Sequence, residues 1–354
     1  MKFKLSDISS MKYGSLPKHK SVDGQYPIFT GYKTSGYSDE FNVEDPEIVV
    51  VARGVGGTGD VKMAPGPAWI TNLSIIVRVN PDLVNKKYLQ LKLAGMGLRY
   101  LDSGSAQSQI TIKDLSEVKI DLPDLDVQTK VAKTIQMFED KISNLQAIND
   151  NLLELGRSYY QNFVDTHDTE GQMVSTIAES VITGKTPSTK DESNYGDDVP
   201  FVTIPDMHSQ IFTTKTTRSL SKKGADSQVK KYLPPFTLSV SSIGTPGLVT
   251  INPEESQTNQ QINSVIAEKE KIWYLFLAFD SLKAHIENMG SGGSTILNLN
   301  KSNFEKIDID WPIDKSALIE FNTVIEPIFM NILNNQREIN SLSMVRDTLI
   351  SELI

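Results

Sequence analysis

The first pattern that could carry chemistry is the glycine-rich string Gly54-Val55-Gly56-Gly57-Thr58-Gly59. It has the G-x-G-x-x-G spacing of dinucleotide-binding loops and follows a predicted strand at 48–52. Such a loop binds a pyrophosphate only where a helix follows, because the amides at the helix N-terminus hold the phosphates. Pro65 and Pro67 exclude a regular helix just after the string. We therefore predict a glycine-rich loop without a nucleotide.

Two other strings match fragments of catalytic motifs. Leu233-Pro234-Pro235-Phe236 is similar to the [N/D]-P-P-[Y/F] signature of amino-methyltransferases, but leucine cannot accept a hydrogen bond from the target amino group. Asp102, Glu117 and Lys119 follow the order of metal-dependent nucleases, in which carboxylates hold Mg²⁺ and lysine polarises water. Lys306 stands where Glu117 would be repeated in the second half, so we predict a strand with a solvated edge there.

Histidine and cysteine do not suggest a metal site. The chain has no cysteine, which excludes disulfides and thiolate ligands. The four histidines are scattered without ligand spacing: His19, His167, His208 and His285. No set of nucleophile, base and orienting residue can be assembled. We predict no catalytic residue, no metal and no cofactor in this chain.

Polar and aromatic runs point instead to recognition, because such side chains can meet phosphates and base edges. The first half contains Lys12-Tyr13, Lys18-His19-Lys20 and the glycine-punctuated run from Tyr26 to Tyr37. The second half contains Lys185-Thr186, Lys215, Arg218, Lys222-Lys223 and Lys230-Lys231-Tyr232. Runs of this kind are more often solvated surface, so alone they leave nucleic-acid binding open.

Composition is that of an ordinary folded protein. The 354 residues are enough for about two domains, and apolar residues at 39% with charged residues at 22% exclude fibrous and disordered classes. The longest apolar run, 272–279, is far shorter than the ~18 residues that cross a bilayer. The residues at Met1 lack the apolar core of a signal peptide. We predict a cytoplasmic protein with no membrane partner.

Net charge is −9, which on its face opposes binding to phosphates. The charge is uneven along the chain: +1 over 1–124, −2 over 125–165, −5 over 166–312 and −3 over 313–354. The first segment is therefore the least unfavourable to DNA.

Two long stretches with helical periodicity stand out from their surroundings. The first runs through Val131, Ile135, Phe138, Ile142, Leu145, Ile148, Leu152, Leu155, Tyr159 and Phe163, and the second through Leu318, Phe321, Ile325, Ile328, Ile332, Asn335, Ile339, Leu342, Val345, Leu349 and Leu353. Both spacings are near 3.5, with one irregularity between Leu145 and Ile148. Pro327 should bend or break the start of the second helix. Helices of ~50–60 Å at ~1.5 Å per residue are too long for one small core, so they should pair.

The rest of the sequence reads as short strands and turns, and it repeats. Strands are predicted at 48–52, 75–79, 118–122, 238–240 and 307–310. Matching positions of the two halves are Leu5-Ser6-Asp7-Ile8 with Val174-Ser175-Thr176-Ile177, Gly14 and Pro17 with Gly184 and Pro187, Tyr88-Leu89-Gln90-Leu91 with Tyr274-Leu275-Phe276-Leu277, Gly104-Ser105 with Gly293-Ser294, and Ile120-Asp121-Leu122-Pro123 with Ile309-Asp310-Trp311-Pro312. The offset grows slowly from 169 to 189, so we predict domain, helix, domain, helix.

The chain resembles the specificity subunits of type I restriction-modification systems. The strings that carry the resemblance are Val51-Ala52-Arg53-Gly54, Ile70-Thr71-Asn72, Gly104-Ser105-Ala106-Gln107, Leu122-Pro123-Asp124-Leu125-Asp126-Val127-Gln128, Ser241-Ser242-Ile243-Gly244, Asn259-Gln260-Gln261 and Gly290-Ser291-Gly292-Gly293-Ser294. Two departures are visible. The family's Glu-Gln pair is Val127-Gln128 here, and the start of the second helix, Pro312-Ile313-Asp314-Lys315-Ser316, keeps only the proline.

The resemblance implies a non-catalytic reader of a bipartite double-stranded DNA target. Its partners would be modification subunits that bind S-adenosylmethionine and methylate adenine, and a restriction subunit can join. A related alternative is the specificity subunit of a type IIB system, whose partner fuses methyltransferase and nuclease. A coiled-coil scaffold without DNA is a second alternative, and a stand-alone nuclease or methyltransferase is disfavoured by the broken motifs.

The fold expected is mixed α/β (α+β), with two repeated target-recognition domains separated by two long antiparallel coiled-coil helices. The predicted parts are a first domain at 1–124, a first helical spacer at 125–165, a second domain at 166–312 and a second spacer at 313–354. The DNA-contacting residues predicted are Lys18, Lys20, Lys33, Thr34, Ser35, Tyr37, Arg53, Ser105, Gln107, Lys185, Thr186, Arg218, Lys222, Lys223 and Ser242. The partner-contacting residues predicted are Gln128, Phe138, Leu152, Tyr159, Ile328, Ile339 and Leu342.

Overall fold

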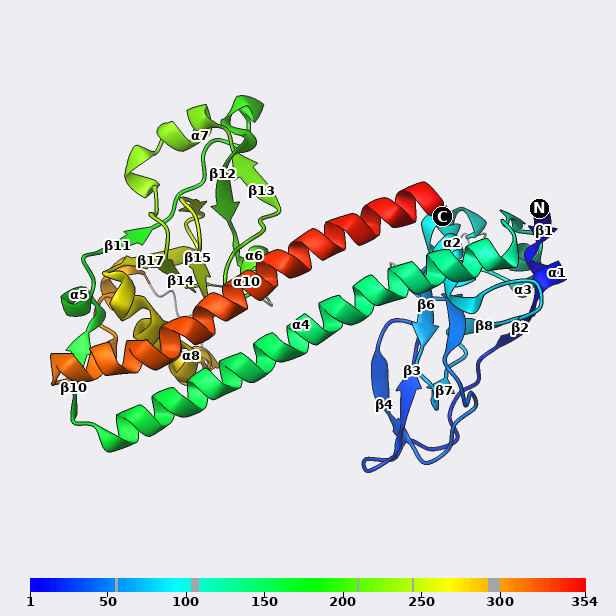
Figure 1. The fold of residues 1–354 in the computed structure, drawn as a ribbon, viewed down its shortest axis with the longest axis horizontal. Coiled ribbons are helices and arrows are strands. Elements are labelled where there is room, and N and C mark those ends of the chain that lie inside the picture. The colour runs from blue at the N-terminus through cyan, green and yellow to red at the C-terminus, as the bar shows by residue number, and fades with distance from the viewer. Residues whose placement is uncertain (55–56, 103–107, 209, 244, 292–299) are drawn as a thin grey trace. The chain divides into compact units, whose positions relative to one another are not determined.

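The computed structural model describes residues 1–54, 57–102, 108–208, 210–243, 245–291 and 300–354, without the side chains of 284–291. The chain divides into two compact units (Figure 1). Unit 1 is Met1–Lys141 together with Ser343–Ile354, and unit 2 is Ile142–Leu342. Two long helices, α4 (Leu125–Thr166) and α10 (Lys315–Leu353), contribute residues to both units.

Unit 1 contains three small sheets. A four-stranded antiparallel sheet has the order β2-β8-β5-β6, a three-stranded sheet has the order β4-β3-β7, and β1 pairs with β9. The strands are β1 (Lys2–Lys4), β2 (Ser9–Tyr13), β3 (Tyr26–Phe29), β4 (Thr34–Ser38), β5 (Glu47–Val51), β6 (Val61–Ala64), β7 (Trp69–Ile70), β8 (Ser74–Val79) and β9 (Lys119–Asp121). The short helices are α1 (Leu5–Ile8), α2 (Lys86–Met96), η1 (Leu98–Leu101) and α3 (Ile112–Ser116).

The central strands of unit 1 form where the sequence has β-branched runs. Ile48 and Val50 of β5 face one apolar cluster, and Val49 between them faces another, so both faces of the sheet are covered. The cap of α2 is Asn85, whose side chain accepts a hydrogen bond from the Tyr88 N–H. The helix ends at Gly97, with φ of 61°.

Unit 2 repeats this arrangement with longer connections. Its four-stranded sheet has the order β11-β17-β14-β15, its three-stranded sheet has the order β13-β12-β16, and β10 pairs with β18. The strands are β10 (Thr169–Met173), β11 (Ser180–Thr183), β12 (Tyr195–Val202), β13 (Arg218–Leu220), β14 (Thr237–Ser241), β15 (Val249–Asn252), β16 (Gln257–Thr258), β17 (Ile262–Ile266) and β18 (Asp308–Pro312). The short helices are α5 (Val174–Ile177), η2 (Glu192–Asn194), α6 (Ile204–Met207), α7 (Lys222–Asp226), η3 (Val229–Lys231) and α9 (Lys301–Phe304), and α8 (Lys269–Ser291) is longer.

One pair of glycines shows how closely the two halves correspond. A Cβ on Gly14 would lie 2.2 Å from the carbonyl oxygen of Thr71, and a Cβ on Gly184 would lie 2.2 Å from that of Asn259. In each half the residue after the glycine donates its amide to the carbonyl of the residue just before that one. Ser15 donates to Ile70, and Lys185 donates to Thr258. The close backbone approach explains why glycine stands at both places.

Helix α8 is sandwiched between the sheet of unit 2 and the long helices (Figure 1). The Trp273 ring lies 5.2 Å from that of Phe329 on α10, and Tyr274 lies 5.1 Å from Tyr160 on α4. All of these rings are buried. Aromatic contacts therefore tie α8 to both long helices.

Within unit 2 the long helices are antiparallel and meet along a regular seam. Asn149 contacts Asn335, while Tyr159 lies 5.6 Å from Phe321. The seam on α4 in this unit passes through Ile142, Leu145, Asn149, Leu152, Gly156, Tyr159 and Phe163, a strict alternation of three and four.

The predicted irregularity after Leu145 was therefore wrong. Ile148 and Leu155 are 47% and 55% exposed, and Asn149 and Gly156 occupy the seam instead. Counting apolar residues missed them because Asn149 has a polar partner on α10 and because Gly156 has no side chain to count.

Pro327 does not break the second long helix, and the expected bend there stays a prediction. Helix α10 continues through Pro327 without interruption. The missing N–H leaves the carbonyl of Thr323 without its helical donor. Thr323 and Pro327 are both exposed, so water can hydrate that carbonyl.

By length and composition alone, α10 is apolar enough to cross a membrane, and it is the one helix in the described part of the chain of which this holds. Its apolar residues Phe321, Ile325 and Phe329 are fully buried in the core of unit 2. A core helix of this kind passes the same test, so the finding is weak support for a membrane span.

Candidate nucleic-acid interface

The polar and aromatic run of the first half forms the hairpin β3–β4. Its turn is closed by Thr30, whose backbone amide and hydroxyl both donate to the carbonyl of Lys33 at 3.1 and 3.0 Å. Lys33 is exposed on this turn, and Thr34, Ser35 and Tyr37 are exposed along β4. A small closed turn therefore presents a cation beside a row of polar side chains.

Lys18 and Lys20 lie on the segment that runs beside β4. Ser21 donates its amide to the carbonyl of Tyr37 at 3.0 Å, which fixes this segment against the strand. Lys18, Lys20 and Lys33 are exposed and form no ion pair within the described residues. The structure thus gathers six of the predicted DNA-contacting residues around one small sheet.

The glycine-rich segment packs against that turn. A Cβ on Gly54 would lie 2.5 Å from the Tyr32 hydroxyl oxygen, and one on Gly57 would lie 2.0 Å from a carbon of its ring. Tyr32 therefore occupies the space that the glycines leave. Burial raises the pKa of the Tyr32 hydroxyl. The next element is strand β6 rather than a helix, so the geometry of a dinucleotide site is not formed.

Arg53 stands at the end of β5, next to that glycine-rich segment. Its guanidinium lies 5.8 Å from the centre of the Tyr13 ring, and its backbone bridges to Gln109. The side chain is exposed. Ser105 and Gln107, predicted beside it, lie outside the described residues.

In unit 2 the strand β13 takes the place of β4, and Arg218 opens it as an exposed residue. Lys185 is exposed beside Thr186, whose hydroxyl donates to the side-chain oxygen of Gln260 at 2.6 Å. Gln260 is exposed but is not among the residues predicted from the sequence to contact DNA. The signal that could have indicated Gln260 as a contact residue is its position within Asn259-Gln260-Gln261, one of the strings that carry the family resemblance.

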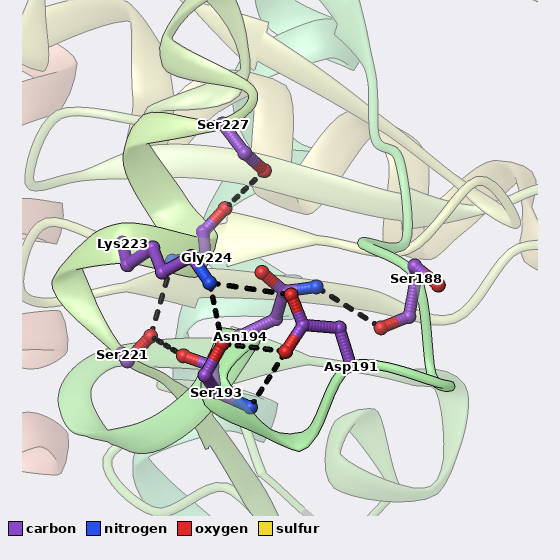
Figure 2. A network of polar contacts seen from close by, with 8 residues as sticks. All are labelled: Ser188, Asp191, Ser193, Asn194, Ser221, Lys223, Gly224 and Ser227. Atoms are coloured by element: carbon purple, nitrogen blue, oxygen red, sulfur yellow. Dashed lines mark hydrogen bonds and ion pairs between the residues drawn. The ribbon is translucent and has the colours of Figure 1, made fainter.

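Lys222 and Lys223 are exposed but already have acidic partners. Figure 2 shows Lys223 with Asp191 and Ser193: its ammonium lies 3.3 Å from Asp191 and donates to the Ser193 hydroxyl at 2.6 Å. Hydrogen bonds from Ser193, followed by that from Lys223, lower the pKa of Asp191. Lys222 lies 3.6 Å from Asp226. A phosphate would have to compete with these carboxylates.

Two predicted contact residues are buried and used inside the chain. Ser242 is 4% exposed and accepts a hydrogen bond from Asn263 at 2.8 Å. Gln128 is 1% exposed, accepts from the Asn85 amide and donates to the carbonyls of Leu83 and Pro123. Their predicted contacts with DNA and with a partner protein do not fit these positions, because neither side chain reaches the surface.

The predicted partner-contacting residues on the helices largely face inward. Leu152, Tyr159 and Ile328 pack into the core of unit 2, while Phe138, Ile339 and Leu342 are half-buried. The large apolar residues that α4 leaves exposed include Val127 and Met137, and also Ile148 and Leu155, which are one heptad apart. The spacing of apolar residues predicted that Ile148 and Leu155 lie in the seam, so their exposure was not predicted.

The residues that matched nuclease and metal patterns have ordinary local partners. Asp102 accepts from the Ser108 hydroxyl and from the Gln109 amide, and Glu117 pairs with Lys4 at 2.8 Å. Among the described residues no three His, Asp or Glu side chains are grouped as a metal site would require. The absence of catalytic residues, metal and cofactor stays a prediction.

Comparison with known proteins decides the family. The model of the family described as "Type I restriction modification DNA specificity domain" matches residues 1–154 and 173–342. The chain belongs to this family.

Relatives within the family are similar over part of their length. The chain is 44% identical over 177 residues to the type I restriction enzyme HindI specificity subunit of Haemophilus influenzae, covering 49% of this chain and 38% of that protein. It is 26% identical over 165 residues to the MjaIX specificity subunit of Methanocaldococcus jannaschii, covering 45% of this chain and 37% of that protein. The match thus spans well under half the length of each relative.

A solved structure matches along the whole chain. The crystal structure of a type I restriction-modification system S subunit from M. genitalium superposes with a TM-score of 0.71 at 18% identity, covering 100% of this chain and 96% of that chain. This likeness confirms the mixed α/β fold with two domains and two long helices.

Proposed function

We propose that this chain is the DNA-reading subunit of a type I restriction-modification system, with no catalytic residue of its own. Each repeated domain reads one half of a bipartite double-stranded target. The chemistry belongs to partner subunits that bind S-adenosylmethionine and methylate adenine, and a restriction subunit joins the same complex in the cytoplasm.

The observation that carries this proposal is the repetition of exposed polar elements on equivalent strands. Lys33 and Thr34 lie at the β3–β4 turn of unit 1, and Arg218 opens β13 in unit 2. The strand orders β4-β3-β7 and β13-β12-β16 are the same. Two similar domains with different side chains at one place are what reading two different half-sites requires.

The helical spacers supply the surface for the modification subunits. Ile148 and Leu155 are exposed on α4, and Ile319 and Val324 are exposed on α10. Exposed apolar side chains on a helix are suited to a protein partner more than to DNA. We place the docking of the methyltransferase on these faces, in place of the residues that the sequence suggested, which largely face inward.

A type IIB specificity subunit is the second candidate, because it would have the same duplicated layout. The two differ in the partner, which in type IIB systems fuses methyltransferase and nuclease. The sequence of the adjacent gene separates them. A coiled-coil scaffold without DNA is disfavoured because Lys18, Lys20 and Lys33 are exposed without an ion pair within the described residues.

The test is to co-express the chain with its adjacent methyltransferase and map methylated adenines across the host genome. We expect a single bipartite motif that disappears when this chain is omitted. Methylation that persists without the chain, or a motif without two halves, would refute the proposal.

A further inference from the structure

The two domains differ in the connection between the two antiparallel strands of the three-stranded sheet. In unit 1 it is the short turn 30–33 between β3 and β4, closed by Thr30. In unit 2 the equivalent connection between β12 and β13 is residues 203–217, of which 209 lies outside the described residues. It carries Lys215, exposed, and leads into Arg218. A connection of this length has no single conformation unless something fixes it.

Asp206 fixes the two ends of the connection to each other. Its carboxylate accepts from the amide and hydroxyl of Thr203 at 2.9 and 2.6 Å, and from those of Thr217 at 2.7 and 2.6 Å. Gln210 donates to the carbonyls of Asp206 and Lys215. These bonds close the base of the loop but leave the stretch 211–214 to be held from elsewhere.

Helix α10, which lies outside residues 166–312, holds that middle stretch. The side-chain oxygen of Gln336 accepts from the amide of Phe212 at 3.0 Å, and the amide of Asn340 donates to the hydroxyl of Thr214 at 2.9 Å. Gln336 and Asn340 are four residues apart and therefore share one face of the helix. Both belong to unit 2, as does the whole connection.

A third contact comes from the sheet beneath. The Thr213 and Thr250 hydroxyls lie 2.7 Å apart in a buried pair, and Thr250 also donates to the carbonyl of Ile211. The loop is thus fixed at 212 and 214 by the helix and at 211 and 213 by β15. Lys215 follows directly after this fixed stretch.

We propose that Gln336 and Asn340 are positioning residues that set which bases the second domain reads. They touch no DNA themselves; they hold the 203–217 connection so that Lys215 and Arg218 meet one arrangement of base edges. The proposal rests on the proposed function and adds to it that specificity of the second half-site depends on residues outside 166–312. The turn 30–33 of unit 1 is closed by its own Thr30, so we expect no such dependence there.

The experiment uses the co-expressed complex and measures the motif of methylated adenines. The variants are Gln336→Ala and Asn340→Ala, with Asn334→Ala as the control because Asn334 is an exposed amide on the same helix. The loss of one hydrogen bond, worth ~1 kcal/mol, allows the loop other conformations. The preference for the parental base over other bases should then fall about fivefold. We expect that loss at bases of one half-site only, the one that stays unchanged when residues 1–124 are exchanged.

Two further variants separate positioning from folding. Gln336→Glu keeps an oxygen that accepts from Phe212, so it should restore the parental motif. Thr214→Val removes the hydroxyl that Asn340 contacts without altering the helix, so it should broaden the same half-site. The proposal is overturned if the alanine variants methylate the parental motif unchanged, if both half-sites broaden together, or if Gln336→Glu behaves like Gln336→Ala. A parental complex that methylates no bipartite motif would instead refute the proposed function.

Discussion

The side-chain amide of Asn335 on α10 donates a hydrogen bond of 2.8 Å to the side-chain oxygen of Asn149 on α4. Both residues stand at seam positions, and Asn149 is 8% exposed. A polar pair inside an apolar seam is satisfied in one alignment of the two helices only, because a shift by one heptad would bury each amide without a partner. The pair therefore fixes the register of the antiparallel helices in unit 2.

This pairing predicts that leucine substitutions at Asn149 and Asn335 have non-additive effects on the free energy of unfolding. Asn149→Leu leaves the Asn335 amide without its partner and should lower the free energy of unfolding by ~1–3 kcal/mol. The double variant with Asn335→Leu should recover most of that loss, because two apolar side chains fill the seam. Urea unfolding of single and double variants measures the coupling, with Asn334→Leu as an exposed control. Equal losses that simply add would show that the amides are not coupled.

Glycine substitutions should have opposite effects at two positions. A Cβ on Gly156 meets only Leu277 at 3.8 Å and Phe329 at 4.0 Å, which are ordinary contact distances. Gly156→Ala should therefore stabilise α4 by up to ~1 kcal/mol. A Cβ on Gly184 would lie 2.2 Å from a carbonyl oxygen, so Gly184→Ala should destabilise by ~1–3 kcal/mol or more. Thermal unfolding tests both, and a loss of stability in Gly156→Ala would contradict the packing described.

Asp206 should make the second unit sensitive to acid. Burial alone would raise its pKa, but the hydrogen bonds from Thr203 and Thr217 outweigh this and lower the pKa below its ordinary value. A carboxyl group whose pKa is lower in the folded than in the unfolded chain stabilises the fold at pH values above its unfolded pKa. This stabilisation is lost as the pH falls through its folded pKa. The stability difference between the parent and Asp206→Asn should shrink as pH is lowered from 6 toward ~3. A difference independent of pH would argue against an ionised Asp206.

Binding of the isolated chain to DNA should be weak and strongly dependent on salt. The net charge of −9 repels the phosphates, and Lys222 and Lys223 have acidic partners of their own. Addition of the methyltransferase should tighten binding. Titrations at several salt concentrations measure this. Lys33→Ala should reduce the slope of the logarithm of the binding constant against that of the salt concentration by about 1. Tight binding that does not depend on salt would contradict the prediction.

Exchange of residues 1–124 for those of a relative should change one half of the methylated motif. The contacts of Lys18, Lys20 and Lys33 are local to that segment, which supports independent reading by the first domain. Mapping of methylated adenines gives the outcome. Changes in both halves would show that the two domains read jointly.

Much of the fold could be predicted because it follows from local patterns. The run Ile48-Val49-Val50-Val51 forms β5 and the spacing of apolar residues gives both long helices. The fine alignment of the helices could not be predicted, since Asn149 becomes a seam residue only through Asn335, which is 186 residues away.

The candidate site was predictable to a smaller degree. Exposed runs such as Lys33-Thr34-Ser35 were found where the sequence placed them, but Ser242 and Gln128 proved to be buried. Polar residue type cannot tell a side chain that reads DNA from one that satisfies a distant buried group such as Asn263. The contacts of Gln336 and Asn340 have no local signal at all, because their partners are 124 and 126 residues away.

Helix α10 contributes residues to both units, and this affects the order in which the units fold during synthesis. Residues 343–354 belong to unit 1: Tyr88 donates to the carbonyl of Leu353, Lys92 to that of Ile354, and the Ile354 side chain packs on the apolar cluster of the first domain. These partners are separated by 265 and 262 residues, so the ribosome makes all of unit 2 in between. Unit 1 therefore cannot be completed before unit 2 has been made, and until then the surface of α2 that α10 will cover stays open.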